Sequence, residues 1–310
     1  MEKKTSPNSP PAEEIARAAD LIRAGELVAF PTETVYGLGA NALDARAVRR
    51  VFAMKGRPAT SPLIVHVSSV AMARSLAAEW PARADELARK YWPGPLTLVL
   101  RKTAQIPDEA TAGLPTAGLR MPAHPVALAL IEAAGVPIAA PSANRFTQLS
   151  PTTAEHVREA FGSELKMILD GGPTEVGIES TVISLVDGEP VLLRPGMIAL
   201  PGIRSEAGPA EGAHASPGQH PKHYSPRTPL LVVENGALPE AGHGVYIGRR
   251  ETVADKSVHL PENAREYAAR IYGVLHELDR EKWDWIAVER PPEEPEWAAI
   301  QDRLRRAAAR

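Results

Sequence analysis

Residues 27–41 read LVAFPTETVYGLGAN, an apolar run followed at once by hydroxyl groups and glycines. The opening LVAF predicts a buried strand, because a short apolar run bounded by turn residues is typical of one. Thr32 and Thr34 then offer hydroxyls, and Gly37 and Gly39 let the backbone approach a ligand closely. The stretch lacks the GxxxxGK[ST] pattern of a P-loop. It therefore predicts a strand that leads into a glycine-containing loop of another kind.

Helices and strands alternate on both sides of this stretch. Before it, apolar residues at helical spacing predict a helix that begins near Pro11 and ends at Gly25. After it, Asp44 is placed to cap a second helix. Further strands are predicted at 63–67, 96–100, 136–140 and 167–170, and further helices at 69–79, 81–91, 125–134 and 153–161. Two apolar runs then flank Asp187 and Gly188, which is a hairpin signal. This order predicts an α/β (α+β) fold with a mixed sheet under helical cover, not a pure Rossmann order.

A change of composition divides the chain. Residues 201–228 are dense in Pro, Gly, Ser and Ala, which is typical of a linker. Beyond them, apolar runs and two helical patterns predict a smaller α/β unit. We therefore expect a main domain at 11–200, a linker or flap over the site at 201–228, and a small C-terminal α/β domain at 229–310.

Composition excludes several classes of function. The 310 residues hold 35 Lys and Arg against 38 Asp and Glu, so the chain lacks the basic excess of a dedicated nucleic-acid binder. The absence of cysteine excludes disulfides, thiolate catalysis and Cys-ligated zinc. The N-terminus lacks the apolar core of a secretory signal, and no stretch approaches the ~20 apolar residues that span a bilayer. We expect a cytoplasmic enzyme without membrane contact.

Cationic residues stand in rigid, Pro-bounded loops. Lys55, Arg57 and Ser61 fall in KGRPATSPLIVHV, a combination that suits phosphate oxygens. Arg120 precedes a proline, and Arg194 leaves an apolar strand. Two plainer readings stay open at this point: cations are favoured at a helix C-terminus, and an arginine in a turn often pairs with a nearby acid.

Two other loops carry polar groups. APSANRFTQLSPTT (140–153) places Ser142, Asn144 and Ser150 before a helix, whose N-terminus favours an anion, although Thr152 or Thr153 can serve simply as its cap. In SPGQHPKHYSP (216–226), His220 and His223 suggest a metal site only weakly, because no third ligand accompanies them.

Taken together, these segments resemble the L-threonylcarbamoyladenylate synthase family, in its long form with an extra C-terminal domain. The resemblance runs in order from about residue 12 to the C-terminus. The matching strings are PTETVYGLGAN, KGRP with SPLIVHV, PGPLT, LRMPAHP, APSAN with SPT, LDGG with GIESTV, LRPG, and SPG followed by HYSP. The resemblance implies a YrdC-like domain with a twisted mixed sheet and a smaller Rossmann-like C-terminal domain.

The family's activity implies a nucleotidyltransferase. L-Threonine, bicarbonate and ATP would give threonylcarbamoyl-AMP and pyrophosphate, the first step in making threonylcarbamoyladenosine in tRNA. Mg²⁺ would accompany ATP, and no tightly bound organic cofactor is implied. The product would pass to a separate tRNA-modifying complex, so contact with tRNA would be weak or absent.

The resemblance also assigns residues. Lys55 and Arg57 would be catalytic charge partners of the phosphates. The residues that would bind L-threonine are Thr34, His66, Arg120, Ala140 (through its backbone) and Ser180. Those that would bind ATP are Arg57, Ser61, Thr116, Ser142, Ser150, Arg194 and Tyr224. The metal ligands are unknown. Tyr224 lies in the predicted linker, which would then close over the nucleotide.

One position departs from the family pattern, and alternatives to the main reading remain. Thr147 stands where the family commonly has glycine, so the resemblance does not decide the backbone conformation at this position. An RNA-binding protein of this fold would show salt-dependent affinity for tRNA. A relative that uses carbamoyl phosphate would cleave ATP in its presence without threonine. A non-catalytic relative is the third alternative, and the retained Lys55, Arg57, Ser142, Asn144 and Arg194 argue against it.

Overall fold

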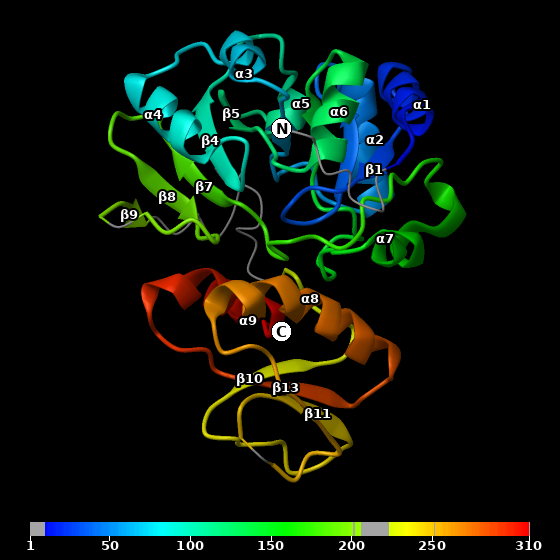
Figure 1. Cartoon of the computed structure of the whole chain (residues 1–310), viewed down its shortest axis with the longest axis vertical. Helices are drawn as coiled ribbons and strands as arrows, with labels where there is room; N and C mark the ends of the chain where they lie inside the picture. The colour runs from blue at the N-terminus through cyan, green and yellow to red at the C-terminus, as the bar shows by residue number, and fades with distance from the viewer. Residues whose placement is uncertain (1–9, 201, 206–222, 251, 310) are drawn as a thin grey trace.

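The computed structural model describes residues 10–200, 202–205, 223–250 and 252–309, which form two units that each contain their own β-sheet (Figure 1). This arrangement confirms the predicted α/β (α+β) class with a mixed sheet. The domain limits at 11–200, 201–228 and 229–310 stay a prediction. Most of the predicted linker, residues 201 and 206–222, lies outside the described residues.

The first unit is a mixed sheet covered by helices. Within the described residues its strand order is β1-β2-β6-β3-β5-β4-β7-β8-β9. The strands are β1 Val28–Phe30, β2 Gly37–Asn41, β3 Ile64–His66, β4 Leu96–Arg101, β5 Thr116–Arg120, β6 Ile138–Ala139, β7 Thr181–Ser184, β8 Val191–Arg194 and β9 Arg204–Ser205. The helices are α1 Ala12–Arg23, α2 Ala45–Lys55, α3 Val70–Leu76, α4 Ala82–Tyr91, α5 Asp108–Thr111, α6 Pro125–Ala134 and α7 Ala154–Phe161, with a 3₁₀ turn at Gly162–Glu164.

Local signals in the sequence set several of these boundaries. The Asp44 carboxylate accepts a hydrogen bond from the Arg46 amide and caps α2, as predicted. The Thr153 hydroxyl caps α7 in the same way. The β7–β8 hairpin forms around Gly188, whose φ of +87° is a conformation that glycine adopts at little cost. These three predictions are confirmed.

Three expectations about the strands were wrong. The GLGAN part of the opening stretch is strand β2 and not a loop, and its Gly39 is required for packing: a Cβ there would lie 2.7 Å from the Phe30 ring and 2.9 Å from Ile138. Residues 116–120 form strand β5 where a turn was expected, because they pair with β4 and β3. The strand predicted at 167–170 makes only a short bridge to β1 through Ala29 and Ile168.

The register of the strands brings the site residues together. Strands β3 and β5 are parallel neighbours, and His66 is paired with Arg120 at their carboxyl ends. Strands β7 and β8 are antiparallel, so Ser180, just before β7, lies near Arg194 at the end of β8. Residues that are distant in sequence therefore meet along one edge of the sheet.

The second unit is a parallel sheet of strand order β10-β13-β11-β12. Its elements are β10 Leu230–Val233, β11 Gly244–Ile247, β12 Lys256–Val258, α8 Ala264–Arg280, β13 Trp285–Glu289, a 3₁₀ turn at Pro295–Trp297 and α9 Ala298–Ala307. Helices α8 and α9 lie between this sheet and the first unit (Figure 1). Strand β12 is too short and polar to have been recognised from its sequence.

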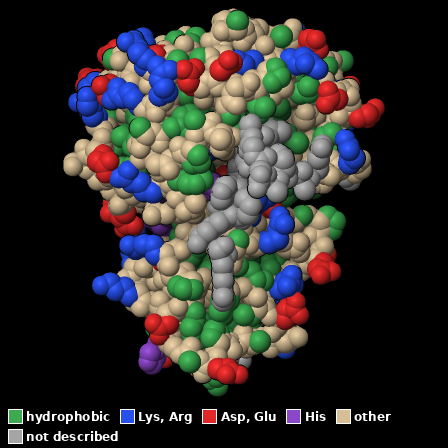
Figure 2. Space-filling view, turned by 180° about the vertical axis from the view of Figure 1, so that it is seen from behind, with side chains coloured by type: hydrophobic (Ala, Val, Ile, Leu, Met, Phe, Trp, Pro, Cys, Tyr) green, Lys and Arg blue, Asp and Glu red, His purple; other side chains and the backbone are tan. Residues whose placement is uncertain are grey.

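The charged side chains on the surface reflect the nearly equal numbers of basic and acidic residues in the chain. On the face shown in Figure 2, basic and acidic side chains are interspersed over both units. Within the described residues, every helix is too short or too polar to cross a lipid bilayer.

Candidate active site

One cavity of the first unit collects side chains from segments that are far apart in the sequence. It encloses about 500 Å³ with its open mouth included. Eight of the thirteen predicted site residues line it: Thr34, Arg57, His66, Arg120, Ala140, Ser142, Arg194 and Tyr224. The other five, which are not among its described lining residues, are Lys55, Ser61, Thr116, Ser150 and Ser180. Four of these five, Lys55, Ser61, Ser150 and Ser180, hydrogen-bond a residue of the lining.

One end of the cavity holds a buried guanidinium that is fixed by a carboxylate. Arg120 is 3% exposed, and its Nη2 donates to Glu33 Oε1 at 2.7 Å. The other oxygen of Glu33 accepts from the Ala123 amide at 3.0 Å. An ion pair with a nearby acid, left open by the sequence, is therefore present. Glu33 therefore sets the orientation of Arg120, which still lines the cavity.

His66 lies beside this arginine as an uncharged ring. Burial and the charge of Arg120 lower its pKa to about 3. Its Nδ1 is buried without a hydrogen-bond partner among the described residues. Thr34, also in the lining, is fully buried, and its hydroxyl is 2.8 Å from that of Thr32. This end thus combines one cation with neutral hydrogen-bonding groups, which suits a small carboxylate.

Two further arginines of the lining add to its positive charge. Burial lowers the pKa of Arg57 to about 10, and its Nη2 donates to the Ser61 hydroxyl at 2.5 Å. Arg194 is 3% exposed, and it donates to the Ser180 carbonyl and hydroxyl, both at 3.1 Å. The Ser180 hydroxyl is also 2.8 Å from that of Thr97.

Lys55 is buried behind the cavity and does not line it. Its Nζ donates to the backbone carbonyls of Ser142 and Asn144 and so holds the loop that follows β6. Burial holds the pKa of Lys55 well below its ordinary value, and the charges of Arg57 and Arg145 add to this effect. In this structure the Lys55 side chain therefore supports the loop.

Two residues that follow the undescribed segment enter the cavity. Tyr224 is 1% exposed, and it packs under the guanidinium of Arg303 at 5.1 Å from the ring centre. His223 lies 4.1 Å from the Tyr224 ring and 6.1 Å from that of Phe146. His220 is outside the described residues. Among those described, no three His, Asp or Glu side chains are grouped as a metal site would require.

Thr147 adopts a backbone conformation that glycine favours. Its φ is +69°, and its carbonyl accepts a hydrogen bond of 2.8 Å from the Ser225 amide. A β-branched residue adopts this conformation at a cost of ~1–2 kcal/mol. The loop therefore has a positive φ at this position, and its carbonyl anchors the chain next to Tyr224.

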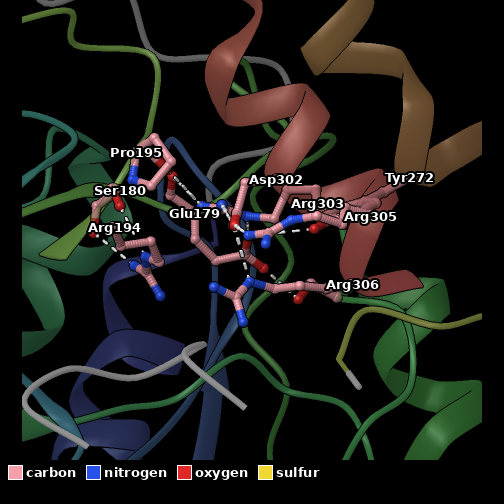
Figure 3. A network of polar contacts seen from close by, with 10 residues as sticks. Glu179, Ser180, Arg194, Pro195, Tyr272, Asp302, Arg303, Arg305 and Arg306 are labelled. Atoms are coloured by element: carbon pink, nitrogen blue, oxygen red, sulfur yellow. Dashed lines mark hydrogen bonds and ion pairs between the residues drawn. The ribbon is translucent and has the colours of Figure 1, made fainter. Parts of the chain in front are cut away.

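The structure adds Glu179, which sequence reasoning missed. This buried carboxylate lines the cavity, accepts from the Ser150 hydroxyl at 2.5 Å and lies 2.7 Å from Nε of Arg303 on α9 (Figure 3). Tyr272 of α8 also donates to it, at 3.3 Å. Burial would raise the pKa of Glu179, but Arg303 and Arg194 hold it below its ordinary value. The only signal in the sequence was its place beside Ser180.

Thr116 lies apart from these contacts. It opens strand β5 and pairs with Arg101 of β4, at the opposite end of the strand from Arg120.

Sequence reasoning missed Glu33 as it missed Glu179. The neighbour of each, Thr34 or Ser180, was singled out, and the acid itself was not. In both cases the partner that reveals the role lies far away in the sequence.

Comparisons with known proteins show what this chain is similar to. A family model described as "Telomere recombination" matches residues 20–196, and one described as "Threonylcarbamoyl-AMP synthase, C-terminal domain" matches residues 181–309. Threonylcarbamoyl-AMP synthase of Pyrococcus abyssi is 44% identical, over 94% of this chain and 93% of that protein. The Bacillus subtilis enzyme is 41% identical, over 95% and 93%. The crystal structure of P. abyssi Sua5 complexed with L-threonine superposes with a TM-score of 0.91 at 42% identity, covering 96% of this chain and 95% of that one.

Proposed function

Since this chain belongs to the family of threonylcarbamoyl-AMP synthases, we propose that its cavity converts L-threonine, bicarbonate and ATP into threonylcarbamoyl-AMP and pyrophosphate. The observation that carries the proposal is the convergence of Arg57, Arg120 and Arg194 on one hollow. Three buried cations from three separate segments suit a triphosphate beside a carboxylate.

The reaction needs positioning and charge neutralisation more than a protein nucleophile. The amine of threonine forms a carbamate, either by attack on CO₂ with release of a proton or by attack on bicarbonate with release of water. A carbamate oxygen then attacks the α-phosphorus of ATP, and pyrophosphate leaves with the electrons of the broken P–O bond. Fixed cations stabilise such a transition state because they need no reorganisation when the charge moves.

We assign the threonine end to Arg120 and its neighbours. The guanidinium, held by Glu33, would bind the substrate carboxylate through its remaining donors. His66 would act as a neutral hydrogen-bonding group, because its low pKa keeps it uncharged near pH 7. Thr34, the backbone of Ala140 and Ser180 would complete this subsite.

We assign the phosphate end to the two remaining arginines. Arg57 with Ser61, and Arg194 from β8, would neutralise phosphate oxygens, while Ser142, Ser150, Thr116 and Tyr224 would contact the nucleotide. The catalytic role assigned to Lys55 remains a prediction. Its two carbonyl contacts support a positioning role, in which it would shape the loop that carries Ser142.

A magnesium ion would come to the site with ATP. Glu179 is the carboxylate in the described lining, and it is already engaged by Arg303, Ser150 and Tyr272. The described residues therefore offer no ready set of protein ligands for the ion. When bound, Mg²⁺ would neutralise pyrophosphate charge; the steps above rest on the protein's own residues.

We further propose that residues 201–228 act as a flap over the nucleotide and that residues 229–310 form a separate domain. The burial of Tyr224 in the cavity supports the flap.

The product would pass to a separate tRNA-modifying complex in the cytoplasm, with weak or absent contact to tRNA. The slightly negative net charge supports that last point.

The decisive experiment is mass spectrometry of the products formed from ATP, bicarbonate and threonine. We expect threonylcarbamoyl-AMP, and far less of the corresponding product when serine replaces threonine. Arg57→Ala should lower pyrophosphate release by about 10²-fold or more, while the exposed Arg46→Ala should not. Unchanged release in Arg57→Ala, or ATP cleavage that needs carbamoyl phosphate and not threonine, would refute the proposal.

A further inference from the structure

Two histidine rings, one from each unit, are stacked where the units meet. His156 belongs to α7 of the first unit and His276 to α8 of the second, and these helices face each other in Figure 1. The ring centres are 3.8 Å apart, and the ring planes differ by 15°. Burial lowers the pKa of both side chains, that of His156 to about 3, so at neutral pH the stacked rings are uncharged and do not repel each other.

The hydrogen bonds of the two rings end on the same short segment of the first unit. His276 Nε2 lies 3.1 Å from the carbonyl oxygen of Ser150, and His156 Nδ1 lies 3.3 Å from the amide nitrogen of Thr152. A carbonyl only accepts and an amide N–H only donates, so Nε2 of His276 carries a proton and Nδ1 of His156 does not. The stacked pair, which we call the histidine clamp, therefore holds residues 150–152 by their backbone.

Ser150 connects this segment to the candidate active site. It is fully buried, and its hydroxyl donates at 2.5 Å to Glu179, which lines the cavity. One residue further, the Pro151 carbonyl accepts from the Tyr36 amide at 2.9 Å. The hydroxyl of Ser150 is thus held by the first unit, and its carbonyl is held by the second.

Helix α8 presents one face to this part of the first unit. Tyr272 and His276 are four residues apart and so lie on the same side of the helix. Tyr272 donates to Glu179 at 3.3 Å, so the two side chains hold neighbouring parts of one network. The backbones also approach closely, since a Cβ on Gly177, whose φ is +79°, would lie 2.3 Å from the carbonyl oxygen of Ala268. Tight packing of α8 therefore keeps the clamp in place.

We propose that His276 is a positioning residue for ATP, because it fixes the Ser150 carbonyl and thereby sets where the Ser150 side chain lies beside the nucleotide. The inference rests on the proposed function, in which Ser150 contacts ATP. The second unit would take part in nucleotide binding through a residue that does not touch the nucleotide. Without His276 Nε2 the buried carbonyl would lack this partner, and the segment would shift to recover one.

The test compares variants of the full chain by pyrophosphate release that depends on threonine and bicarbonate, with ATP and threonine varied in turn. In His276→Gln the side-chain amide reaches the position of Nε2, whereas the amide in His276→Asn is one methylene short of it. Arg280→Met is the matched control, because it removes another contact of α8 with the first unit, the ion pair with Glu159, which does not involve Ser150. Calorimetry with a non-hydrolysable ATP analogue measures affinity without turnover.

We expect His276→Asn to raise the KM for ATP and the Kd of the analogue about three- to tenfold, the equivalent of one lost hydrogen bond, while kcat and the KM for threonine change little. His276→Gln should restore the original values, and Arg280→Met should keep them. An unchanged KM for ATP in His276→Asn, an equal rise in Arg280→Met, or no restoration in His276→Gln would overturn the inference and leave the proposed function intact.

Failure of the proposed function gives a different result. If the original chain binds the analogue but forms no threonylcarbamoyl-AMP, the proposed function fails, and the Kd values of the three variants decide the inference. If the original chain does not bind the analogue either, the proposed function and the inference are both wrong.

Discussion

Nε of Arg303, on the last helix, lies 2.7 Å from the carboxylate of Glu179 in the wall of the candidate active site, across 124 residues of sequence (Figure 3). Both side chains are almost completely buried, at 2% and 8% exposure. Glu179 also holds the Ser150 hydroxyl. The second unit therefore supplies a counter-charge to the cavity of the first, and the two units are coupled through a buried ion pair.

Loss of that counter-charge should be costly. Arg303→Met keeps the approximate length of the side chain but removes the ion-pair partner of the buried Glu179, and loss of one partner of a buried pair typically costs about 3–5 kcal/mol. We expect the free energy of unfolding, measured in urea, to fall by that order. The matched variant Arg305→Met removes an exposed partner of Asp302 and should cost less than about 1 kcal/mol. Equal losses in both variants would contradict the coupling.

Glu33 should act on threonine binding through Arg120. Glu33→Gln keeps the size of the side chain but removes the charge that orients the guanidinium. We expect the KM for threonine to rise about tenfold or more while kcat changes less, because the lost orientation weakens binding of the carboxylate. Glu109→Gln, which removes a surface partner of Arg49, is the control and should leave both constants unchanged. A fall in stability with an unaltered KM would assign Glu33 a purely structural role.

Acid should destabilise the fold through its buried histidines. Burial lowers the pKa of His66 and of His156 to about 3, below the ordinary 6.5. Between pH 6.5 and 3 the unfolded chain therefore binds protons that the folded chain does not, so stability falls as pH falls, by at most about 1.4 kcal/mol per pH unit for each proton. Urea midpoints measured across this range should fall less steeply in His156→Gln.

An exposed histidine supplies a control of opposite sign. The hydrogen bond with Asp255 raises the pKa of His243, so its contribution to stability is present at low pH and is lost as pH rises through that pKa. His243→Gln should therefore make the acid-induced fall slightly steeper, not shallower. If His156→Gln and His243→Gln alter the slope in the same direction, the histidine account is wrong.

Thr147→Gly should stabilise the loop. Glycine adopts the observed φ of +69° without the steric cost of a β-branched residue, although it loses more backbone entropy on folding. The balance predicts a gain of about 0.5–1 kcal/mol in the free energy of unfolding. Thr153, with φ −140°, has no such strain and caps α7, so Thr153→Gly should give no gain. A destabilised Thr147→Gly would show that contacts of the threonine side chain outweigh the strain.

Signals confined to a few neighbouring residues were readable without the structure. The apolar run before the first loop, the cap at Asp44 and the hairpin at Gly188 each depend on interactions within a handful of positions. The family-like strings located the cations of the cavity in the same way. These features are local, because propensity, capping and turn geometry act over one or two turns of backbone.

Only the tertiary structure decided which residues pair with one another. Glu33 meets Arg120 across 87 residues and Glu179 meets Arg303 across 124. The Lys55 side chain donates to two carbonyls that lie 87 and 89 residues further along the chain. Strand β5 could not be predicted either, because its neighbours in the sheet supply its hydrogen bonds. The sequence by itself therefore determined which segments carry charge and which are apolar. Which charges neutralise one another, and which remain for a substrate, depended on packing that brings distant segments together and removes them from water.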